Sequence, residues 1–473
     1  MAMTQRVVRR AGDTTCRREH LAIHCAGGGV QWRPAGQQTS SATLSYDDAG
    51  RKTSETVSYP NPQGGSTSLG YAYTYSLAGK KTTLTWPDST ELAYGYSLHG
   101  ELASLTIPGE GELSVNRFDW LQPAKVTLPG GSSREASHDG LLSLQTLQVR
   151  TPAQQSLLEL GHIYGLAQEL TSRSRTDTSS AGSTSTSSTF DYDDELRLTT
   201  ATTTGAITDT ETFGLDAVAN RTSHSRTSGA WAYDANNRLT QAGTGPDAPR
   251  YTWDDAGNLT QRTEGSLITT FGYDSSNRLT EVRINGALAA RYGYDPMNRR
   301  LWKEQYRDRQ GAPLVQAQRT LYLYADEGLL AEATQAITLQ ADLTVSATAA
   351  PQISTQYGLR PEAPFSTGVL FVKTRNSNGQ ATFAYLHHDH LGTPIAASDK
   401  QGRLVWAARY TPFGQASLIT PAPTPELPTI ALNLRLPGQY FDQETGLHYN
   451  WNRYYDASTG RYTQEDPIGL EGG

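Results

Sequence analysis

One short phrase recurs four times in this chain at a nearly constant spacing. An aromatic residue is followed by Asp, and Gly or Asn stands four positions after the aromatic. The aromatic residues that begin the phrases are Tyr233, Trp253, Tyr273 and Tyr294. A period of 20 to 21 residues is typical of a repeat array in which each unit is completed by its neighbours.

Each position of the phrase has a physical reason in a β-hairpin. Asp opens a turn, because its carboxylate accepts hydrogen bonds from the backbone ahead of it. Gly257, Asn277 and Asn298 stand where we expect a positive φ, which Gly and Asn adopt at the least cost. Leu and Thr then restart a strand, with alternate residues on opposite faces. The repeats predict an all-β ribbon of hairpins, more than one-third strand and nearly without helix.

Less complete copies of the phrase occur on both sides of these four. Aromatic residues with Gly four positions later are Tyr46, Tyr75, Tyr96 and Tyr324. Leu196 and Ala219 occupy the same turn position after Tyr192 and Leu215, and we expect looser hairpins there because Leu and Ala disfavour a positive φ. Residues 172–189 are rich in Ser and Thr, and we interpret them as an exposed loop inside the array.

The composition fits thin, two-faced β-structure better than one large core. The hydrophobic fraction is 36%, and 25 Tyr accompany only 9 Phe; each Tyr adds apolar area but needs a partner for its hydroxyl.

The net charge is −7 with both signs interspersed, so nucleic acid is a poor partner. No apolar run is long enough for a membrane span. The N-terminus lacks the apolar stretch of a secretory signal.

Changes in this rhythm divide the chain into four expected segments. Residues 1–40 form an irregular N-terminal segment, and residues 41–340 form the repeat array. Residues 341–382 interrupt the rhythm as an irregular connection. A denser block occupies residues 383–473.

Two clusters contain residues of metal-ligating types. The first comprises Cys16, His20, His24 and Cys25, and the second comprises His387, His388, Asp389 and His390. The first packs its ligand types too tightly for a normal zinc spacing and lacks a second Cys-x-x-Cys. Adjacent positions in the second wrap one ion poorly, and polar side chains at a turn are the better interpretation. We therefore expect neither a metal nor another cofactor; a local disulfide between the two cysteines stays open.

Two similar loops lie among many aromatic residues near the end of the chain. Residues 442–446 and 456–460 each predict a type I turn closed by a left-handed Gly, a common hairpin connection. The aromatic residues around them are Tyr440, Phe441, Tyr449, Trp451, Tyr454, Tyr455 and Tyr462. We interpret this cluster as a structural plug rather than a platform for sugars or peptides.

Three stretches of the last block carry a resemblance to a known family. They are residues 383–394, residues 405–414, and residues 437–470, which end in Asp466-Pro-Ile-Gly-Leu470. These stretches resemble the core of the Rhs family, and the tyrosine–aspartate phrases are similar to its YD repeats. The resemblance extends over nearly everything from residue 41 onward.

The resemblance implies a YD-repeat ribbon wound into a hollow shell, related to the shells of insecticidal toxin-complex C components and teneurins. In that family the shell encloses a variable C-terminal toxin, which the core itself cuts off. The implied partners are this toxin and secretion-apparatus or carrier proteins. The implied location is the cytoplasm until a specialised system exports the protein, or the cell surface. About a dozen recognisable repeats are few for a sealed shell, so we expect a curved, partly open sheet with an exposed edge near residues 1–50.

Asp466 is the candidate catalytic residue that the resemblance implies. In Rhs-like cores the Asp of this motif belongs to an aspartyl-type centre that cleaves a second, downstream motif. Such chemistry needs two carboxylates that share a proton, and this sequence stops at Gly473 without a second motif. We expect no self-cleavage by this polypeptide alone, and a turn residue is the alternative interpretation. We expect Asp466 beside the aromatic cluster, in or near the interior of the shell, either buried there or paired with Arg453 or Arg461.

Three functions follow from these observations. The first is a polymorphic-toxin shell fragment that encapsulates and delivers a C-terminal toxin in interbacterial competition. The second is a cell-surface adhesion module that binds carbohydrate through its aromatic residues and Thr-rich faces. The third is a self-cleaving aspartyl protease core whose downstream half lies outside this sequence.

Overall fold

The computed structural model describes most of the chain from residue 40 onward. The described residues are 40–179, 182–347, 349–375, 379–420, 423, 427, 429–467 and 469, together with the backbone of 15–18, 21–24 and 29–32. No α-helix occurs among them, and about 59% of the described residues are in strands. The predicted all-β architecture is confirmed. None of the described residues forms a helix of the length and apolar character that crossing a membrane requires.

The first half of the chain forms one antiparallel sheet in which each strand pairs with the next strand in sequence. Its strands are β3 (Gly29–Trp32), β4 (Ser40–Tyr46), β5 (Lys52–Pro60), β6 (Ser66–Tyr75), β7 (Lys81–Thr85), β8 (Glu91–Tyr96), β9 (Leu102–Ile107), β10 (Gly111–Asp119), β11 (Gln122–Thr127), β12 (Ser133–His138), β13 (Leu144–Arg150), β14 (Ser156–Tyr164), β15 (Leu170–Ser179), β16 (Gly182–Tyr192), β17 (Leu198–Gly205), β18 (Asp209–Leu215) and β19 (Arg221–His224). A separate hairpin precedes it, made of β1 (Thr15–Arg18) and β2 (Leu21–His24).

A second antiparallel sheet follows the same sequential order. Its strands are β20 (Ala232–Tyr233), β21 (Leu239–Gln241), β22 (Arg250–Trp253), β23 (Leu259–Glu264), β24 (Leu267–Tyr273), β25 (Leu279–Ile284), β26 (Ala287–Tyr294), β27 (Arg300–Arg307), β28 (Pro313–Ala325), β29 (Gly328–Leu339), β30 (Val345–Ala347), β31 (Gln352–Leu359), β32 (Val369–Arg375), β33 (Ala381–His388), β34 (Pro394–Ser398), β35 (Leu404–Tyr410) and β36 (Ala416–Leu418). The last sheet is small and contains β37 (Tyr440–Asp442), β38 (Leu447–Asn450), β39 (Arg453–Asp456) and β40 (Arg461–Tyr462).

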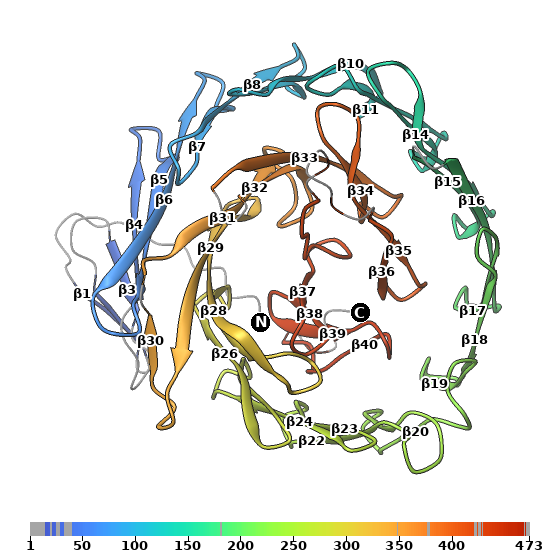
Figure 1. Cartoon of the computed structure of the whole chain (residues 1–473). Coiled ribbons are helices and arrows are strands. Elements are labelled where there is room, and N and C mark those ends of the chain that lie inside the picture. The colour runs from blue at the N-terminus through green and yellow to red at the C-terminus, as the bar shows by residue number, and fades with distance from the viewer. Residues whose placement is uncertain are drawn as a thin grey trace.

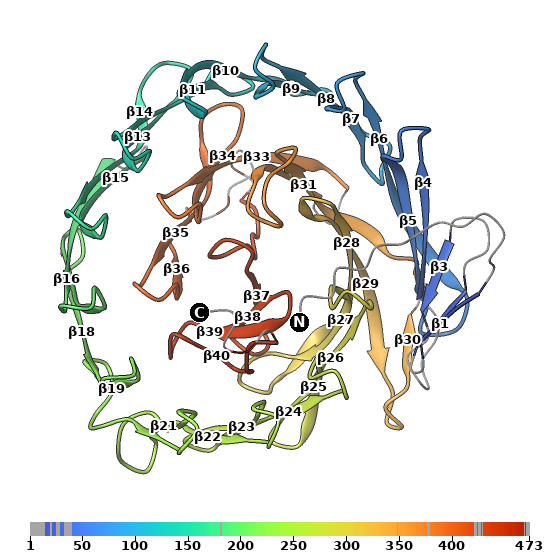
Figure 2. The ribbon, with the colours of Figure 1, turned by 180° about the vertical axis from the view of Figure 1, so that it is seen from behind.

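The ribbon curls into a ring and then continues into its own interior (Figures 1 and 2). Strands β4 to β19 form most of the outer wall, and β20 to β25 continue it. Strands β28, β29 and β31 to β36 lie inside the wall, β30 lies at the edge of the ring near β3, and the small sheet β37 to β40 lies innermost. The fold is therefore a curled hairpin ribbon with the end of the chain as its plug, as the sequence predicts.

The repeated phrase forms one type of turn, which Asp274 illustrates. Its Oδ1 accepts hydrogen bonds from the backbone N–H groups of Ser276 and Arg278, at 2.9 and 3.0 Å. Its Oδ2 accepts a hydrogen bond from Nε of Arg278 at 2.8 Å. The backbone N–H of Asn277 closes the turn by donating to the carbonyl oxygen of Asp274, at 3.0 Å. Asp and Arg of the phrase thus hold the turn from both ends.

Two side chains of the phrase connect each repeat to its neighbours. The Tyr273 hydroxyl donates a hydrogen bond to the carbonyl oxygen of Leu259 in the preceding repeat, at 2.9 Å. Nη1 of Arg278 donates to the carbonyl oxygen of Asp295 in the following repeat, at 3.0 Å. The presence of the aromatic residue and the Arg in the phrase is therefore explained by their contacts with neighbouring repeats, as a repeat array requires.

The predicted left-handed turn positions are confirmed, and the looser hairpins are not. Positive φ values occur at Gly257 (76°), Asn277 (57°) and Asn298 (63°). Leu196 and Ala219 adopt the same conformation, at 60° and 63°. The N–H of Leu196 donates to the carbonyl oxygen of Asp193 at 3.0 Å, the same bond as in the other turns. The surrounding hydrogen bonds impose the turn even where the residue disfavours it.

The Ser- and Thr-rich segment 172–189 is not a loop. It forms the long hairpin β15–β16, with a continuous register from Ser172↔Thr189 to Ser179↔Gly182. Hydroxyls bond across the strands, for example Thr176 to Ser185 at 2.9 Å. β-Branched Thr favours a strand, and this pairing explains how so polar a segment remains in the sheet.

Two further expectations need correction. The segment 341–382, expected to be irregular, contains β30, β31 and β32, which continue the second sheet. At Tyr324 the chain makes a shorter turn than in the other repeats, because Ala325 pairs directly with Gly328. The exposed edge predicted near residues 1–50 falls largely outside the described residues, and β4 is covered there by β3.

Polar contacts fasten the inner strands to the concave face of the wall. The Tyr59 hydroxyl of β5 donates to the carbonyl oxygen of Tyr322 in β28 at 2.8 Å. Lys373 of β32 pairs with Asp88 in the wall, with Nζ 2.6 Å from Oδ2. Each contact joins residues more than 250 positions apart in sequence, so the layers assemble only when the ribbon curls.

Candidate functional site

The small sheet β37–β40 is held in the interior by a buried ionic cluster. Asp442, at the end of β37, accepts hydrogen bonds from Nη1 and Nη2 of Arg300, at 2.5 and 3.0 Å. Lys303 Nζ lies 2.9 Å from Oδ1 of Asp442 and 3.1 Å from Oε2 of Glu444. Arg300, Asp442 and Glu444 are fully buried. Two cations from β27 therefore meet two anions from the plug.

The cluster keeps its charges in spite of its burial. Burial by itself would raise the pKa of Asp442, but Arg300 and Lys303 outweigh it and hold the pKa below its usual range. Burial would likewise lower the pKa of Lys303, yet Asp442 and Glu444 raise it above the ordinary value. A balanced buried set of this kind loses much stability when one member is removed.

Tyrosine hydroxyls form a second attachment between the plug and the inner strands. Tyr440 of β37 donates to Oε2 of Glu332 in β29 at 2.8 Å, and Tyr357 of β31 donates to Oε1 at 2.5 Å. Burial raises the pKa of Glu332 although both hydroxyls favour its charged form. Tyr440, Tyr449 and Tyr454 are buried, so the aromatic cluster is a packed plug, as predicted from the sequence.

The two predicted turns of the plug are confirmed. Gly446 and Gly460 have φ values of 73° and 71°. Their backbone N–H groups donate to the carbonyl oxygens of Asp442 and Asp456, each at 2.8 Å. The turn after β37 thus places both carboxylates of the ionic cluster at the start of one hairpin.

Asp466 lies beside this aromatic sheet. Its Oδ2 is 2.8 Å from Nη2 of Arg453, and the two side chains are 28% and 24% exposed. The guanidinium of Arg453 also lies over the Tyr462 ring, 3.8 Å from its centroid. The expected neighbourhood is therefore present. Of the two alternatives, the ion pair with Arg453 is found, at a position that solvent reaches. The catalytic role of Asp466 remains a prediction.

The segment that leads to Asp466 is fastened to the turns of the second sheet. The backbone N–H of Leu259 donates to the carbonyl oxygen of Thr463 at 2.9 Å. Nε2 of Gln464 donates to the carbonyl oxygen of Asn277 at 2.9 Å. Asp466 is thus positioned by the repeat turns as well as by the plug.

The histidine-rich sequence at 387–390 is part of the inner layer. Nε2 of His387 lies 2.9 Å from Oγ of Ser398, and burial lowers the pKa of His387 to about 3. Asp389 opens a turn, with Oδ1 accepting hydrogen bonds from the N–H groups of Leu391 and Thr393 at 3.0 and 2.9 Å. The side chains of the other cluster, which contains Cys16 and Cys25, lie outside the described residues.

Arg300 and Lys303 are functional positions that the pattern analysis misses. In the three preceding phrases the corresponding position holds Leu239, Leu259 or Leu279, all buried. Arg300 takes the place of this Leu in the fourth phrase. A charged residue at a position that the three preceding phrases fill with buried Leu was the available signal for a buried partner.

Comparison with known proteins agrees with these observations. The family model described as Teneurin YD-shell matches residues 131–314, and that described as RHS protein matches residues 384–418. A region of 243 residues, 47% of this chain, is 28% identical to double-stranded DNA deaminase toxin A of Burkholderia cenocepacia (strain H111) and covers 15% of it. A region of 95 residues, 20% of this chain, is 43% identical to toxin protein Tse5 of Pseudomonas aeruginosa and covers 7% of it. The matches thus span only a small part of these relatives.

Solved structures share the fold over nearly the whole chain. The Tc holotoxin pore of Photorhabdus luminescens superposes with a TM-score of 0.58 at 15% identity, over 93% of this chain and 24% of that chain. A TcdB2-TccC3 structure gives a TM-score of 0.55 at 15% identity, over 94% of this chain and 25% of that chain. At this identity the likeness concerns the fold alone.

Proposed function

This chain belongs to the Rhs family of YD-repeat proteins, and on that premise we propose that its ribbon forms part of a shell that encloses a toxic polypeptide. One observation carries the proposal. The last strand of the ribbon, β40, lies inside the ring (Figures 1 and 2). A polypeptide that continues from β40 would therefore start in the interior. The ionic cluster at Asp442 would hold this end of the chain in place.

The shell would act by exclusion. A continuous ribbon of hairpins satisfies its own backbone hydrogen bonds and leaves the enclosed polypeptide no route to its target. The relatives named as toxins support a toxic cargo. We propose delivery in interbacterial competition through a secretion apparatus or a carrier protein. The chain would stay in the cytoplasm until export or reach the cell surface.

Asp466 would serve release of the cargo. We propose that it supplies one acid of an aspartyl-type centre whose second acid comes from the polypeptide downstream. Its place beside the plug and its contact with Arg453 support this role, because cleavage there would free the cargo without loosening the shell. Two carboxylates sharing a proton are the minimum for this chemistry.

A carbohydrate-binding adhesion module is the weaker alternative. Stacking against a sugar requires exposed aromatic faces, and most of the aromatic residues near the end of the chain pack against each other. Tyr449 and Tyr454, for example, are 5% and 2% exposed. Their burial favours the shell.

Protease protection tests the enclosure directly. The full chain is extended at its C-terminus by a flexible tag with one protease site, and a matched control carries the same tag in the exposed turn between Gln63 and Gly64. We expect the C-terminal tag to be cut at least tenfold more slowly than the tag in the turn. Equal rates of cutting would contradict enclosure.

A further inference from the structure

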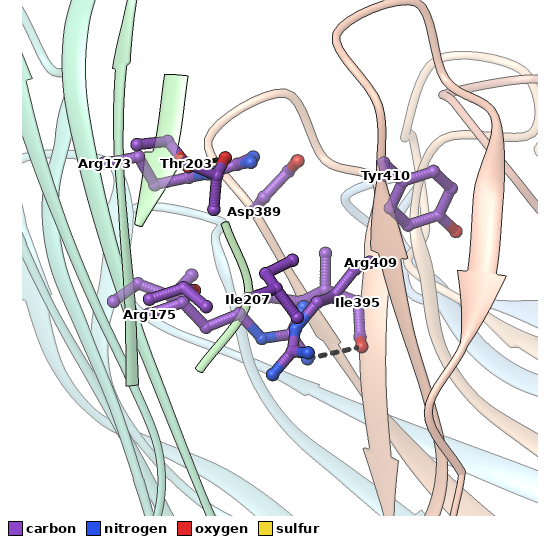
Figure 3. A pocket seen from close by; sticks show the side chains of 11 residues that line it. Arg173, Arg175, Thr203, Ile207, Asp389, Ile395, Arg409 and Tyr410 are labelled. Carbon is purple, nitrogen blue, oxygen red and sulfur yellow. Dashed lines mark hydrogen bonds between the residues drawn. The ribbon is translucent and has the colours of Figure 1, made fainter. Parts of the chain in front are cut away.

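A cavity lies between the outer ribbon and the inner strands, and the proposed enclosure does not use it (Figure 3). Its volume is about 60 Å³, enough for a few water molecules or a small polar group. Arg173 and Arg175 reach it from β15 of the wall, and Arg409 of β35 and Asp389 reach it from the inner layer. Residues from both layers therefore face one small polar space.

Arg175 is fully engaged in this space. Its Nε and Nη2 donate to Oδ1 of Asp177 at 3.0 and 2.8 Å. Its Nη1 donates to the carbonyl oxygen of Ala408 at 2.7 Å, and Nη2 reaches the carbonyl oxygen of Ile395 at 3.3 Å, the bond drawn in Figure 3. Arg175 thus joins the two layers and has little capacity for a ligand.

Arg173 and Arg409 keep donors that are not used. Within the described part of the chain, the guanidinium of Arg173 makes no hydrogen bond or ion pair; it lies over the Phe190 ring, 5.8 Å from the centroid, and the charge of Asp389 attracts it. Nε of Arg409 is buried without a hydrogen-bond partner, and its Nη2 lies 3.4 Å from Asp177. Arg173 is only partly buried, so its donors stay free to bind a ligand, whereas the buried Nε of Arg409 without an acceptor is unfavourable.

The charges around the cavity are also unbalanced. Three guanidinium groups, those of Arg173, Arg175 and Arg409, face two carboxylates, those of Asp177 and Asp389. The excess is one positive charge. Burial lowers the pKa of Arg173, and the charge of Asp389 opposes this effect. A single bound negative charge would balance the site.

We propose that this cavity binds a carboxylate, with Arg173 as its two-pronged partner and Nε of Arg409 as a further donor. A carboxylate carries the one missing charge, and its two oxygens match the planar fork of an arginine. A phosphate dianion would exceed the charge that is needed. Because the donors come from both layers, an occupied site fastens the wall to the inner strands.

The carboxylate has two candidate sources with the same chemistry. One is a small free acid. The other is a side chain or C-terminus of an enclosed polypeptide, and this second source rests on the proposed function. Acetate represents the free acid, and N-acetylglycine represents a carboxylate at the end of a peptide.

Calorimetric titration of the full chain at pH 7.5 and constant ionic strength tests the site. The probes are acetate, N-acetylglycine and phosphate, with chloride as the balancing salt. We expect saturable acetate binding to the wild type and at least about tenfold weaker binding to Arg173→Gln, as for loss of a charge-assisted hydrogen bond. Arg173→Lys should lie between them. Arg117→Gln, which changes an arginine with a 53% exposed side chain, should bind acetate like the wild type.

Each outcome decides the proposal. N-acetylglycine binding like acetate supports a site open to a peptide carboxylate, and binding of acetate alone supports a site for a small free acid. Phosphate binding more tightly than acetate, or equal acetate binding by all variants, overturns the proposal. If Arg173→Gln does not fold, the wild type is treated with phenylglyoxal, which modifies arginine, with and without acetate. Slower modification of Arg173 but not of Arg117 in the presence of acetate supports the proposal. The same rate of modification of Arg173 with and without acetate overturns it. The tag-protection experiment does not depend on acetate, so failure of enclosure is seen separately.

Discussion

The guanidinium of Arg300 donates to both carboxylate oxygens of Asp442, at 2.5 and 3.0 Å, across 142 positions of sequence. This contact joins the wall of repeats to the plug. It forms where the fourth phrase has Arg at a position that the three preceding phrases fill with buried Leu. The start of the β37–β38 hairpin is thus fixed by a charged residue of the repeat array.

Removing one member of this cluster should loosen the plug. Asp442→Asn leaves Arg300 and Lys303 without their shared anion, and we expect a loss of about 3–5 kcal/mol in the free energy of unfolding. Urea denaturation followed by tyrosine fluorescence measures it. Asp119→Asn, in an exposed pair with Arg117, should change stability by less than about 1 kcal/mol. Similar losses in both variants would show that the cluster does not fasten the plug.

Two glycines with nearly the same backbone test the contact between layers. Gly130 and Gly79 have φ values of 87° and 81°. A Cβ at Gly130 would lie 1.9 Å from the carbonyl oxygen of Lys400 in the inner layer, whereas a Cβ at Gly79 would meet nothing within 4 Å. Both Ala variants share the strain of a positive φ, about 1 kcal/mol. We expect Gly130→Ala to lose about 1–3 kcal/mol more in thermal unfolding; equal losses would mean that the layers separate easily there.

The turn at Leu196 should be improved by glycine. Leu196 is held at a φ of 60°, which costs a side-chain-bearing residue about 1–2 kcal/mol. Leu196→Gly should therefore stabilise the chain by about 0.5–1 kcal/mol. Asn277→Val, at 57°, should destabilise it by about 1–2 kcal/mol. Chemical denaturation that shows the same sign for both changes would refute this account of the turns.

Buried histidines should make the fold sensitive to acid. Burial lowers the pKa of His162 to about 3, and its ring lies 5.0 Å from that of His390 across the two layers. Since the folded pKa lies below the ordinary value of 6.5, the unfolded chain takes up the proton first. Stability is complete above pH 6.5 and is lost as pH falls toward 3, by at most about 1.4 kcal/mol per pH unit for each such histidine.

The measurement is the urea midpoint between pH 7.5 and 4.5. His162→Phe removes one titrating group from the interface between the layers and should flatten the fall in stability. His99→Phe, at an exposed turn, serves as the control and should leave the slope unchanged. A wild-type midpoint that is constant over this range would contradict the assignment.

Self-cleavage should require both Asp466 and a downstream acid. The chain alone should remain intact, because one carboxylate does not supply both the base and the acid of an aspartyl mechanism. A longer chain with a second acid and a second Asp-Pro-x-Gly-Leu motif should be cut, and Asp466→Asn should abolish the cut on a gel. Asp255→Asn, which changes an exposed turn acid, should be cut normally. Equal cleavage of the Asp466 variant would leave Asp466 a turn residue.

Local chemistry made much of this fold predictable. The segment from Asp274 to Arg278 specifies its own turn. The carboxylate of Asp274 accepts hydrogen bonds from the backbone and the side chain of Arg278, four residues away. The period then places each hairpin beside the next, and the ribbon follows. Gly446 and Gly460 could be assigned for the same reason, because a left-handed residue closes a short turn regardless of its surroundings.

Contacts between distant residues could not be predicted in this way. Leu196 is forced into a left-handed turn by its neighbours, and the Ser- and Thr-rich strands β15 and β16 are held by pairing with adjacent strands. The curl of the ribbon brings Arg300 to Asp442 and Arg173 toward Asp389. No periodic pattern encodes such pairs, because a repeat specifies only its nearest neighbours. The sequence by itself therefore determined the ribbon and its turns, and the tertiary structure alone decided which charges meet in the interior.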